Sequence, residues 1–312
     1  MRTIIPILTA LLIGVTARAE SLPEKYAEHG TLIVTPFKTA PFPHPVRAEG
    51  HYYKTNFFNA KEHYSDSTVG IFIPQNFHAG RKIDFVVHFH GWGNNVAHAL
   101  DHYRLIDQFS ASDRNAILIV PQGPYDASDT FDGKLEDPNG FARFMAEALS
   151  VLETKANIQK PQLGKIILSG HSGGYGVISS ILDVGGLTDH VQEVWLFDAL
   201  YGRTEKFTKW FNAPKSNSLR FIDIYTDHGG TKEETETLMA DLKKKKIPFY
   251  FAQEKDAKPS DLAKNKLVFI HTDNTHDVVM QNNDTFLNFL NTSHLAPIQP
   301  EQRSAAASPK LQ

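Results

Sequence analysis

The chain has 312 residues, of which 41% are hydrophobic and 21% are charged, and it contains no cysteine. This composition is typical of a globular protein and too apolar for intrinsic disorder. The absence of cysteine excludes disulfides, thiolate catalysis and iron–sulfur clusters, and a net charge of −3 argues against a nucleic-acid partner, which would favour a basic surface.

Residues 1–19 have the three parts of a secretory signal. Arg2 precedes an apolar run over 4–15, and Ala17 and Ala19 form a small-x-small cleavage pattern. The run is shorter than the ~20 residues that span a bilayer. We therefore expect cleavage after Ala19, no stable membrane insertion, and export to a periplasm or the medium. The lack of cysteine favours a bacterial exporter.

Strands and helices alternate along the rest of the chain. Thr31–Thr35 and His51–Phe57 predict antiparallel strands added at one edge of a sheet. Later runs are apolar and several are continuous, which predicts parallel strands buried on both faces. They are Val69–Pro74, Ile83–His90, Ala116–Pro121, Lys165–Gly170, Glu193–Asp198, Arg220–Thr226, Pro248–Ala252 and Lys266–His271.

Three helices follow from spacing and capping. Apolar residues at helical intervals predict one helix over 139–154. Thr231 and Glu234 form a capping-box pattern at the start of a second, and a terminal helix is expected from Val278 to Leu290. This alternation predicts an α/β fold with a mostly parallel central sheet and helices on both faces. We expect one domain over 20–295 and a flexible tail over 296–312.

The strongest chemical motif is Gly170-His171-Ser172-Gly173-Gly174, placed between a buried strand and a helix of small residues. Such a turn is strained and presents its serine as a nucleophile, and the glycines let neighbouring backbone pass closely. The glycines also resemble a dinucleotide-binding turn, with Asp198 as the ribose-binding acid. Against that alternative, the turn lies in the middle of the chain and export removes the nicotinamide supply.

A second turn favours the nucleophile interpretation. The strand Ile83–His90 runs into His90-Gly91-Trp92-Gly93. A turn at this place supplies main-chain N–H groups to an oxyanion, so the N–H groups of Trp92 and Gly173 are the candidate donors. His88 and His90 also share one face of their strand, which leaves a metal-dependent hydrolase as an alternative. No complete ligand motif accompanies them, and we expect neither a metal nor a cofactor.

A serine nucleophile needs a base, and His276 follows the last strand in the loop before the terminal helix. His271, at the end of that strand, is the alternative. With the serine turn, the His-Gly turn and this late histidine, the chain resembles the α/β-hydrolase superfamily over about residues 67–292. The resemblance implies an esterase-like serine hydrolase with the chain order serine, acid, histidine.

Two aspartates compete for the role of the acid. Asp198 follows four apolar residues, where a buried carboxylate needs a partner such as an imidazole. Asp227 ends the next strand and begins a glycine-rich turn. The burial argument favours Asp198, with Asp227 as the alternative acid.

The sequence does not identify the substrate. The segment 122–140 is long and rich in turn residues, and such loops line the crevice of open α/β sheets. No apolar insertion suggests a lipase lid, so we expect a small-molecule or acylated substrate, either an ester or an amide. A catalytically silent hydrolase-fold protein that binds a ligand is the remaining alternative.

Overall fold

The computed structural model describes residues 20–213 and 219–298. The predicted signal over 1–19 lies outside these residues, as does the predicted tail beyond Ile298. Nine of the described strands form one sheet. In spatial order they are β1 (Gly30–Pro36), β4 (Thr68–Pro74), β6 (Ala116–Pro121), β5 (Lys82–Phe89), β7 (Gln162–His171), β8 (Val191–Phe197), β9 (Arg220–Thr226), β11 (Leu267–Thr272) and β10 (Tyr250–Gln253).

The sheet is mostly parallel, as predicted. Only β4 runs against its neighbours, because it pairs antiparallel with both β1 and β6 while the other pairs are parallel. The strand β7, which leads into Ser172, lies in the middle of the sheet between β5 and β8. All six residues of β6 are buried, which is the pattern expected of a strand covered on both faces.

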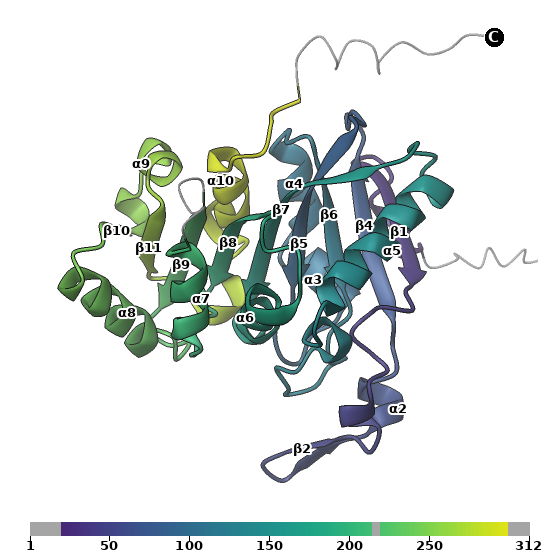
Figure 1. The fold of residues 1–312 in the computed structure, drawn as a ribbon, viewed down its shortest axis with the longest axis horizontal. Coiled ribbons are helices and arrows are strands. Elements are labelled where there is room, and N and C mark those ends of the chain that lie inside the picture. The colour runs from purple at the N-terminus through teal and green to yellow at the C-terminus, as the bar shows by residue number, and fades with distance from the viewer. Residues whose placement is uncertain (1–19, 214–218, 299–312) are drawn as a thin grey trace, which may run out of the picture.

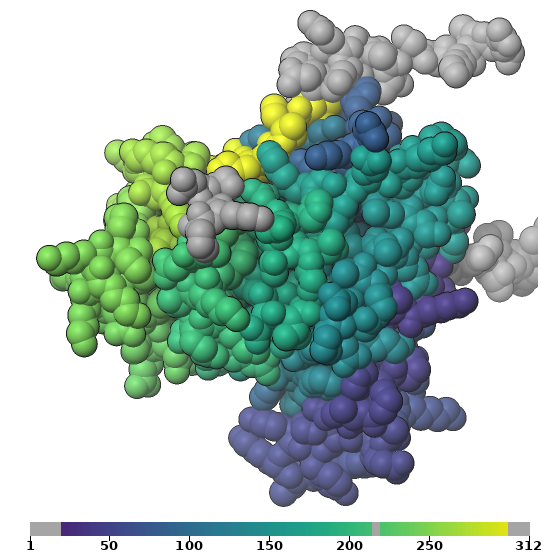
Figure 2. All heavy atoms as spheres, in the orientation of Figure 1, coloured from purple at the N-terminus to yellow at the C-terminus, as the bar shows by residue number. Residues whose placement is uncertain are grey.

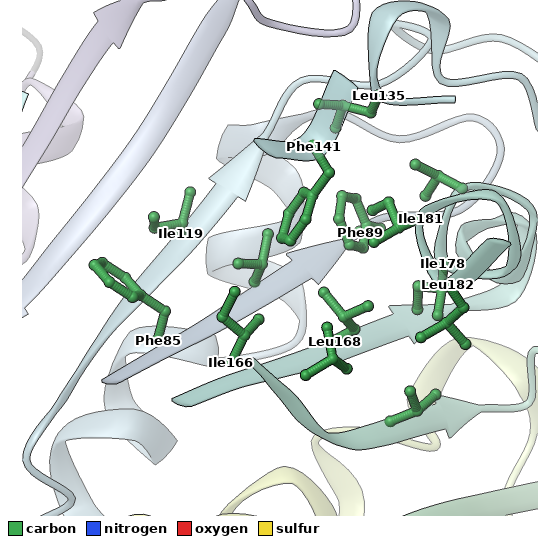
Figure 3. Packing of buried hydrophobic residues seen from close by; sticks show 14 of the residues in the cluster. Phe85, Phe89, Ile119, Leu135, Phe141, Ile166, Leu168, Ile178, Ile181 and Leu182 are labelled. Atoms are coloured by element: carbon green, nitrogen blue, oxygen red, sulfur yellow. The ribbon is translucent and has the colours of Figure 1, made fainter. Parts of the chain in front are cut away.

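Helices cover both faces of the sheet (Figure 1). Apolar side chains from one group pack in the same cluster as Phe85, Leu168 and Phe221: α5 (Gly140–Lys155), α6 (Tyr175–Val184), α7 (Thr204–Phe211) and α8 (Lys232–Lys244). Figure 3 shows part of this cluster, with Phe141, Ile178 and Ile181 over the strands. The opposite face carries α3 (Val96–His102), α4 (Leu105–Ala111), α9 (Pro259–Lys264) and α10 (Thr285–Thr292).

The segment 51–57 was wrongly predicted to join the edge of the sheet. It forms a separate hairpin of β2 (His51–Tyr53) and β3 (Asn56–Phe58), which projects from the body beside the short helix α2 (Ala60–His63) (Figures 1 and 2). Its Phe58 packs with a small cluster that contains Phe42 and Tyr64. Aromatic residues therefore hold the hairpin against the body without any pairing to the main sheet. The remaining short helix is α1 (Leu22–Lys25).

Two boundaries near the C-terminus also differ from the prediction. The expected helix 278–290 is interrupted, because Asn283 and Asp284 have φ of +56° and +49° and only α10 is a regular helix. The start of the expected tail is ordered, since the N–H of Ile298 donates to the carbonyl of Asp113 at 2.7 Å and Ile298 is buried. Among the described residues no helix is long and apolar enough to cross a membrane.

Candidate active site

Ser172 lies on a tight turn between the central strand and a helix. It begins the 3₁₀ turn η3 (Ser172–Gly174), and its φ of +52° lies in the left-handed region that non-glycine residues rarely adopt. A Cβ atom at Gly174 would lie 2.6 Å from the carbonyl oxygen of Phe89, so only glycine fits there. The turn thus holds Ser172 half-buried at the end of β7, ahead of α6.

The His-Gly turn that follows β5 lies directly against Ser172. A Cβ atom at Gly91 would lie 3.1 Å from Oγ of Ser172, and one at Gly173 would lie 2.8 Å from Cδ1 of Trp92. The side chain of Trp92 therefore lies against Gly173 beside the serine, and the role of the two N–H groups as oxyanion donors stays a prediction. The indole of Trp92 is 40% exposed and contacts Tyr53 of the β2–β3 hairpin at 4.8 Å between ring centroids.

His90 and His88 have structural partners. His90 Nδ1 donates to the carbonyl of Gly91 at 2.9 Å, while Nε2 accepts from the N–H of Gly123 at 3.0 Å, so this ring braces the turn. His88 is fully buried, with Nδ1 3.0 Å from Oγ of Ser169. Burial lowers the pKa of both imidazoles. Within the described residues, no group of three or more potential metal ligands is found.

Asp198 and His276 form a hydrogen-bonded pair. Nδ1 of His276 lies 2.6 Å from Oδ2 of Asp198, which is completely buried. Thr226 donates to the same carboxylate from its N–H at 3.1 Å and from its hydroxyl at 2.9 Å, and the hydroxyl of Thr231 donates as well. Burial acts to raise the pKa of Asp198, but the bonds from His276 and Thr231 outweigh burial and hold the pKa below its usual value.

The hydroxyl of Thr231 explains why the predicted capping box at the start of α8 is wrong. Thr231 does precede α8, but its side chain makes no capping hydrogen bond to that helix. Because the hydroxyl donates to Asp198 instead, the predicted capping box with Glu234 does not form. The start of α8 is thereby attached to the buried carboxylate.

The alternative acid and the alternative base bind each other. Oδ1 of Asp227 lies 3.0 Å from Nε2 of His271, and 2.6 Å from Nζ of Lys232. Nδ1 of His271 lies 2.9 Å from the side-chain oxygen of Gln253, so both ring nitrogens are occupied. Asp227 is exposed, and the bonds from Lys232 and His271 lower its pKa. Neither residue pairs with Asp198 or His276.

His276 is presented at the surface of the site. It begins the 3₁₀ turn η6 (His276–Val278), and its side chain is 27% exposed. His171, the residue before Ser172, bonds the main-chain carbonyl of His276 at 2.9 Å, and the two imidazoles are 4.6 Å apart between centroids. With Nδ1 directed to Asp198, Nε2 of His276 is the nitrogen that remains for a nearby hydroxyl.

Tyr201 is a site residue that sequence reasoning missed. Its hydroxyl donates to the carbonyl of Gly229 at 2.6 Å, and its ring lies 6.4 Å from that of His276. Burial, with a smaller effect from Asp198, raises its pKa to about 12, and an interaction with the Ser172 hydroxyl opposes the rise. Tyr201 therefore stays neutral beside both Ser172 and His276. No motif in the sequence distinguishes it from the other tyrosines.

The segment 122–140 packs against the serine turn, although its role in binding substrate stays a prediction. The Thr130 methyl group would lie 3.3 Å from a Cβ at Gly173. Glu136 accepts from the hydroxyl of Ser180 on α6 at 2.7 Å, and Arg203 lies 3.5 Å from the same carboxylate. These contacts hold the segment against the serine turn and the middle of α6.

Comparison with known proteins identifies the fold. No protein-family model matches the sequence, and no curated protein matches it. Among solved structures, a mutant feruloyl esterase module from Clostridium thermocellum, complexed with sinapinate, is similar with a TM-score of 0.52 and 11% identity, over 85% of this chain and 88% of that chain. The fluorophosphonate-binding serine hydrolase F of Staphylococcus aureus has a TM-score of 0.50 and 10% identity, over 84% and 97%.

The chain has the α/β-hydrolase fold. The parallel order of β5 to β11 and the helices on both faces agree with this assignment. In an α/β-hydrolase fold the turn after the central strand is where a nucleophile is placed, and Ser172 occupies that turn here. At such low identity the likeness establishes the fold, and the chemistry must be argued from the residues themselves.

Proposed function

We propose that this protein is a serine esterase that forms an acyl-enzyme on Ser172. The observation that carries the proposal is the bond between the buried Asp198 and His276, whose main-chain carbonyl is bonded by His171, the residue before the strained Ser172. A buried, hydrogen-bonded carboxylate fixes the tautomer of an imidazole and stabilises the imidazolium that forms when it accepts a proton. His276 is then the base, Asp198 orients it, and Asp227 has no role.

The reaction follows from this arrangement. Oγ of Ser172 attacks the ester carbonyl while Nε2 of His276 takes the hydroxyl proton. The N–H groups of Trp92 and Gly173 stabilise the oxyanion, and His276 returns the proton to the alcohol as it leaves. Water, deprotonated by His276, then attacks the acyl carbonyl, and Oγ of Ser172 regains a proton when the acid leaves. An amide follows the same steps with an amine as leaving group.

The substrate is proposed to be a small or carbohydrate-linked acyl ester. The indole of Trp92 and the segment 122–140 border the serine turn, and both are open to solvent in part. One structure of the same fold is a feruloyl esterase module, and another is a serine hydrolase. We also propose that residues 1–19 direct export to a periplasm or the medium and are then removed, which is typical of such a segment.

Labelling of the purified chain 20–312 with a fluorophosphonate probe tests the proposal. The probe forms a phosphorus–oxygen bond to an activated serine and releases fluoride. We expect labelling that is lost in Ser172→Ala and strongly slowed in His276→Gln. Hydrolysis of 4-nitrophenyl acetate by the same variants gives a second readout. A folded wild type that neither reacts with the probe nor hydrolyses the ester would overturn the proposal.

The metal-dependent alternative has its own test. Both nitrogens of His90 are bonded to main-chain groups, so neither is directed at a ligand. We expect the esterase activity of the wild type to survive prolonged dialysis against EDTA. The activity of His88→Ala should be equally insensitive to this dialysis. Activity that falls after dialysis and returns on adding zinc would instead favour the metal hydrolase.

A further inference from the structure

A chain of buried polar side chains connects the turn of Trp92 to the loop of His276. Nδ2 of Asn94 lies 3.1 Å from the hydroxyl of Tyr103. That hydroxyl lies 2.9 Å from Nδ1 of His171, whose Nε2 lies 2.9 Å from the main-chain oxygen of His276. The residues Asn94, Tyr103 and His171 are each at most 5% exposed. The proposed chemistry uses none of these three side chains.

The direction of each hydrogen bond follows from the partners. The N–H of Asn95 donates to Oδ1 of Asn94 at 2.7 Å, which orients the amide so that Nδ2 points to Tyr103. An amide nitrogen only donates, so the Tyr103 oxygen accepts and its hydrogen goes to Nδ1 of His171. The carbonyl of His276 only accepts, so Nε2 of His171 carries a proton. His171 is thus held in one tautomer.

This chain of bonds needs a neutral His171. Burial, followed by the nearby imidazole of His276, lowers the pKa of His171 to about 3. A protonated ring would carry a hydrogen on Nδ1, where the bond from Tyr103 arrives. The bonds therefore persist over the pH range in which a histidine base operates.

The loop of His276 needs such support, because Thr275 and Asp277 on either side of it are exposed. The bond to Asp198 fixes the ring of His276, but it does not fix the main chain. A second bond comes from the end of α3, next to Tyr103, since Nε2 of His102 lies 2.9 Å from the carbonyl oxygen of Asp277. Two consecutive carbonyls of the loop are thus held by side chains on or connected to α3.

We propose that Tyr103 and His171 are positioning residues, which hold the main chain of His276 and keep its imidazole aligned between Asp198 and Ser172. This inference rests on the proposed function, because it assigns the two residues to the same reaction. Through Asn94, the turn that carries Trp92 is attached to the loop of the base by one continuous set of bonds.

Three single variants and one double variant test the inference through the hydrolysis of 4-nitrophenyl acetate and the rate of fluorophosphonate labelling. Because small misplacements of a catalytic group are costly, His171→Leu and Tyr103→Phe should lower kcat and the labelling rate about 10- to 100-fold, with little change in KM. His171→Gln should retain most of the activity, because its side-chain amide can still donate to the carbonyl of His276. The double variant should be no slower than His171→Leu, since both changes interrupt one path.

His190→Leu is the matched control. Its Nδ1 also bonds a main-chain carbonyl, that of Gly164 at 2.9 Å, at the opposite end of β7. We expect it to label at the wild-type rate. Wild-type rates in folded His171→Leu and Tyr103→Phe would overturn the inference and leave the proposed function intact. Should His171→Leu not fold, Tyr103→Phe decides the question alone. An unreactive wild type would instead remove the proposed function, and the inference with it.

Discussion

Asp198 and Asp227 follow neighbouring strands, yet only one of the two carboxylates is shielded from water. Asp198 is completely buried and receives hydrogen bonds from His276, Thr226 and Thr231. Asp227 is exposed and pairs with Lys232. Since the electrostatic effect of a charge is stronger in a water-excluded site, the two residues should differ sharply in their importance for the reaction.

Replacing each aspartate by asparagine measures this difference. Asp198→Asn should lower kcat about 10³- to 10⁴-fold, because an amide can hold His276 in the wrong tautomer. Asp227→Asn removes only exposed pairs and should change kcat by less than about threefold. Steady-state hydrolysis of 4-nitrophenyl acetate provides the comparison. A larger loss in Asp227→Asn would identify Asp227 as the acid and refute the assignment of Asp198.

A second buried carboxylate should make stability depend on pH. Asp223 on β9 is buried; Oδ2 accepts from Thr235 at 2.6 Å, while Oδ1 has no partner. Burial raises its pKa to about 7 from a usual 3.8. The folded state therefore binds a proton that the unfolded state has lost above about pH 4, and stability from this group falls as the pH rises through 7.

Asp223→Asn should remove this dependence. The shift corresponds to at most about 4 kcal/mol in the free energy of unfolding. We expect the variant to gain stability over the wild type at pH 8 and to match it more closely at pH 4, in urea unfolding at the two values. Equal differences between variant and wild type at both pH values would show that Asp223 is ionised in the folded protein.

The residues of the candidate site could be predicted to different degrees. Ser172, Trp92, Gly173 and His276 lie in turns whose local sequence carries the signal. The choice between Asp198 and Asp227 remained open, because the donors Thr226 and Thr231 lie about 30 residues further along the chain. Tyr201 and Tyr103 contact partners that are distant in the sequence, and no motif or spacing links these tyrosines to them. These contacts depend on how the loops meet at the strand ends.

At the scale of elements, the turn after β9 encloses Asp198. Thr226 binds the carboxylate, and its hydroxyl oxygen also accepts from the N–H of Gly229 at 2.8 Å. A Cβ atom at Gly229 would lie 1.6 Å from Oδ2 of Asp198. Gly229 is therefore a glycine because the carboxylate occupies the space of a side chain.

Gly229→Ala should displace either the turn or the carboxylate. A shift of about 1 Å in the acid should lower the rate of fluorophosphonate labelling about 100-fold. Gly80→Ala is the control, because its Cβ would meet only the carbonyl oxygen of Lys82 at 3.5 Å, an ordinary contact. Equal labelling of both variants would mean that the turn adapts without moving Asp198.

Some helices and strands, like some site residues, could be predicted from the sequence, and others could not. Buried parallel strands were predictable, because a strand covered on both faces must be apolar throughout. The interruption before α10 was not predicted, although residues 281–285 are all polar. It follows from the left-handed Asn283 and Asp284 and from a bond between Thr285 and Glu254 at 2.8 Å, which lies outside the local sequence. The prediction for the segment 51–57 was wrong for a related reason, because the aromatic residues of this hairpin pack on loops instead of on the main sheet.

At the scale of the whole molecule, the buried histidines and the buried Asp223 have opposite effects on how stability depends on pH. Burial lowers the pKa of His88, His90 and His171 in the folded state. Below about pH 6.5 the unfolded chain takes up protons at these positions that the folded chain does not. Their contribution to stability is therefore present at higher pH and is lost as the pH falls.

His88 offers the simplest test of this balance, because its Nε2 is buried without a partner and it lies outside the catalytic pair. His88→Gln should remove up to one proton from those taken up on unfolding. The slope of the free energy of unfolding below pH 6.5 should then fall by up to about 1.4 kcal/mol per pH unit. Urea unfolding at pH 5 and 6.5 measures the slope. Equal slopes in wild type and His88→Gln would show that His88 takes no part.

The projecting hairpin offers a point of attachment next to the candidate active site. Its tip, Lys54 and Thr55, is exposed, and the main sheet makes no hydrogen-bonded ladder with it. An affinity tag or a short epitope grafted between these two residues would extend outward from the lobe seen in Figure 2. Tyr53 flanks this turn and its ring contacts Trp92, so a protein attached to a solid support through that point would carry the linker beside the proposed oxyanion turn, while Phe58 holds the base of the hairpin against Phe42 and Tyr64.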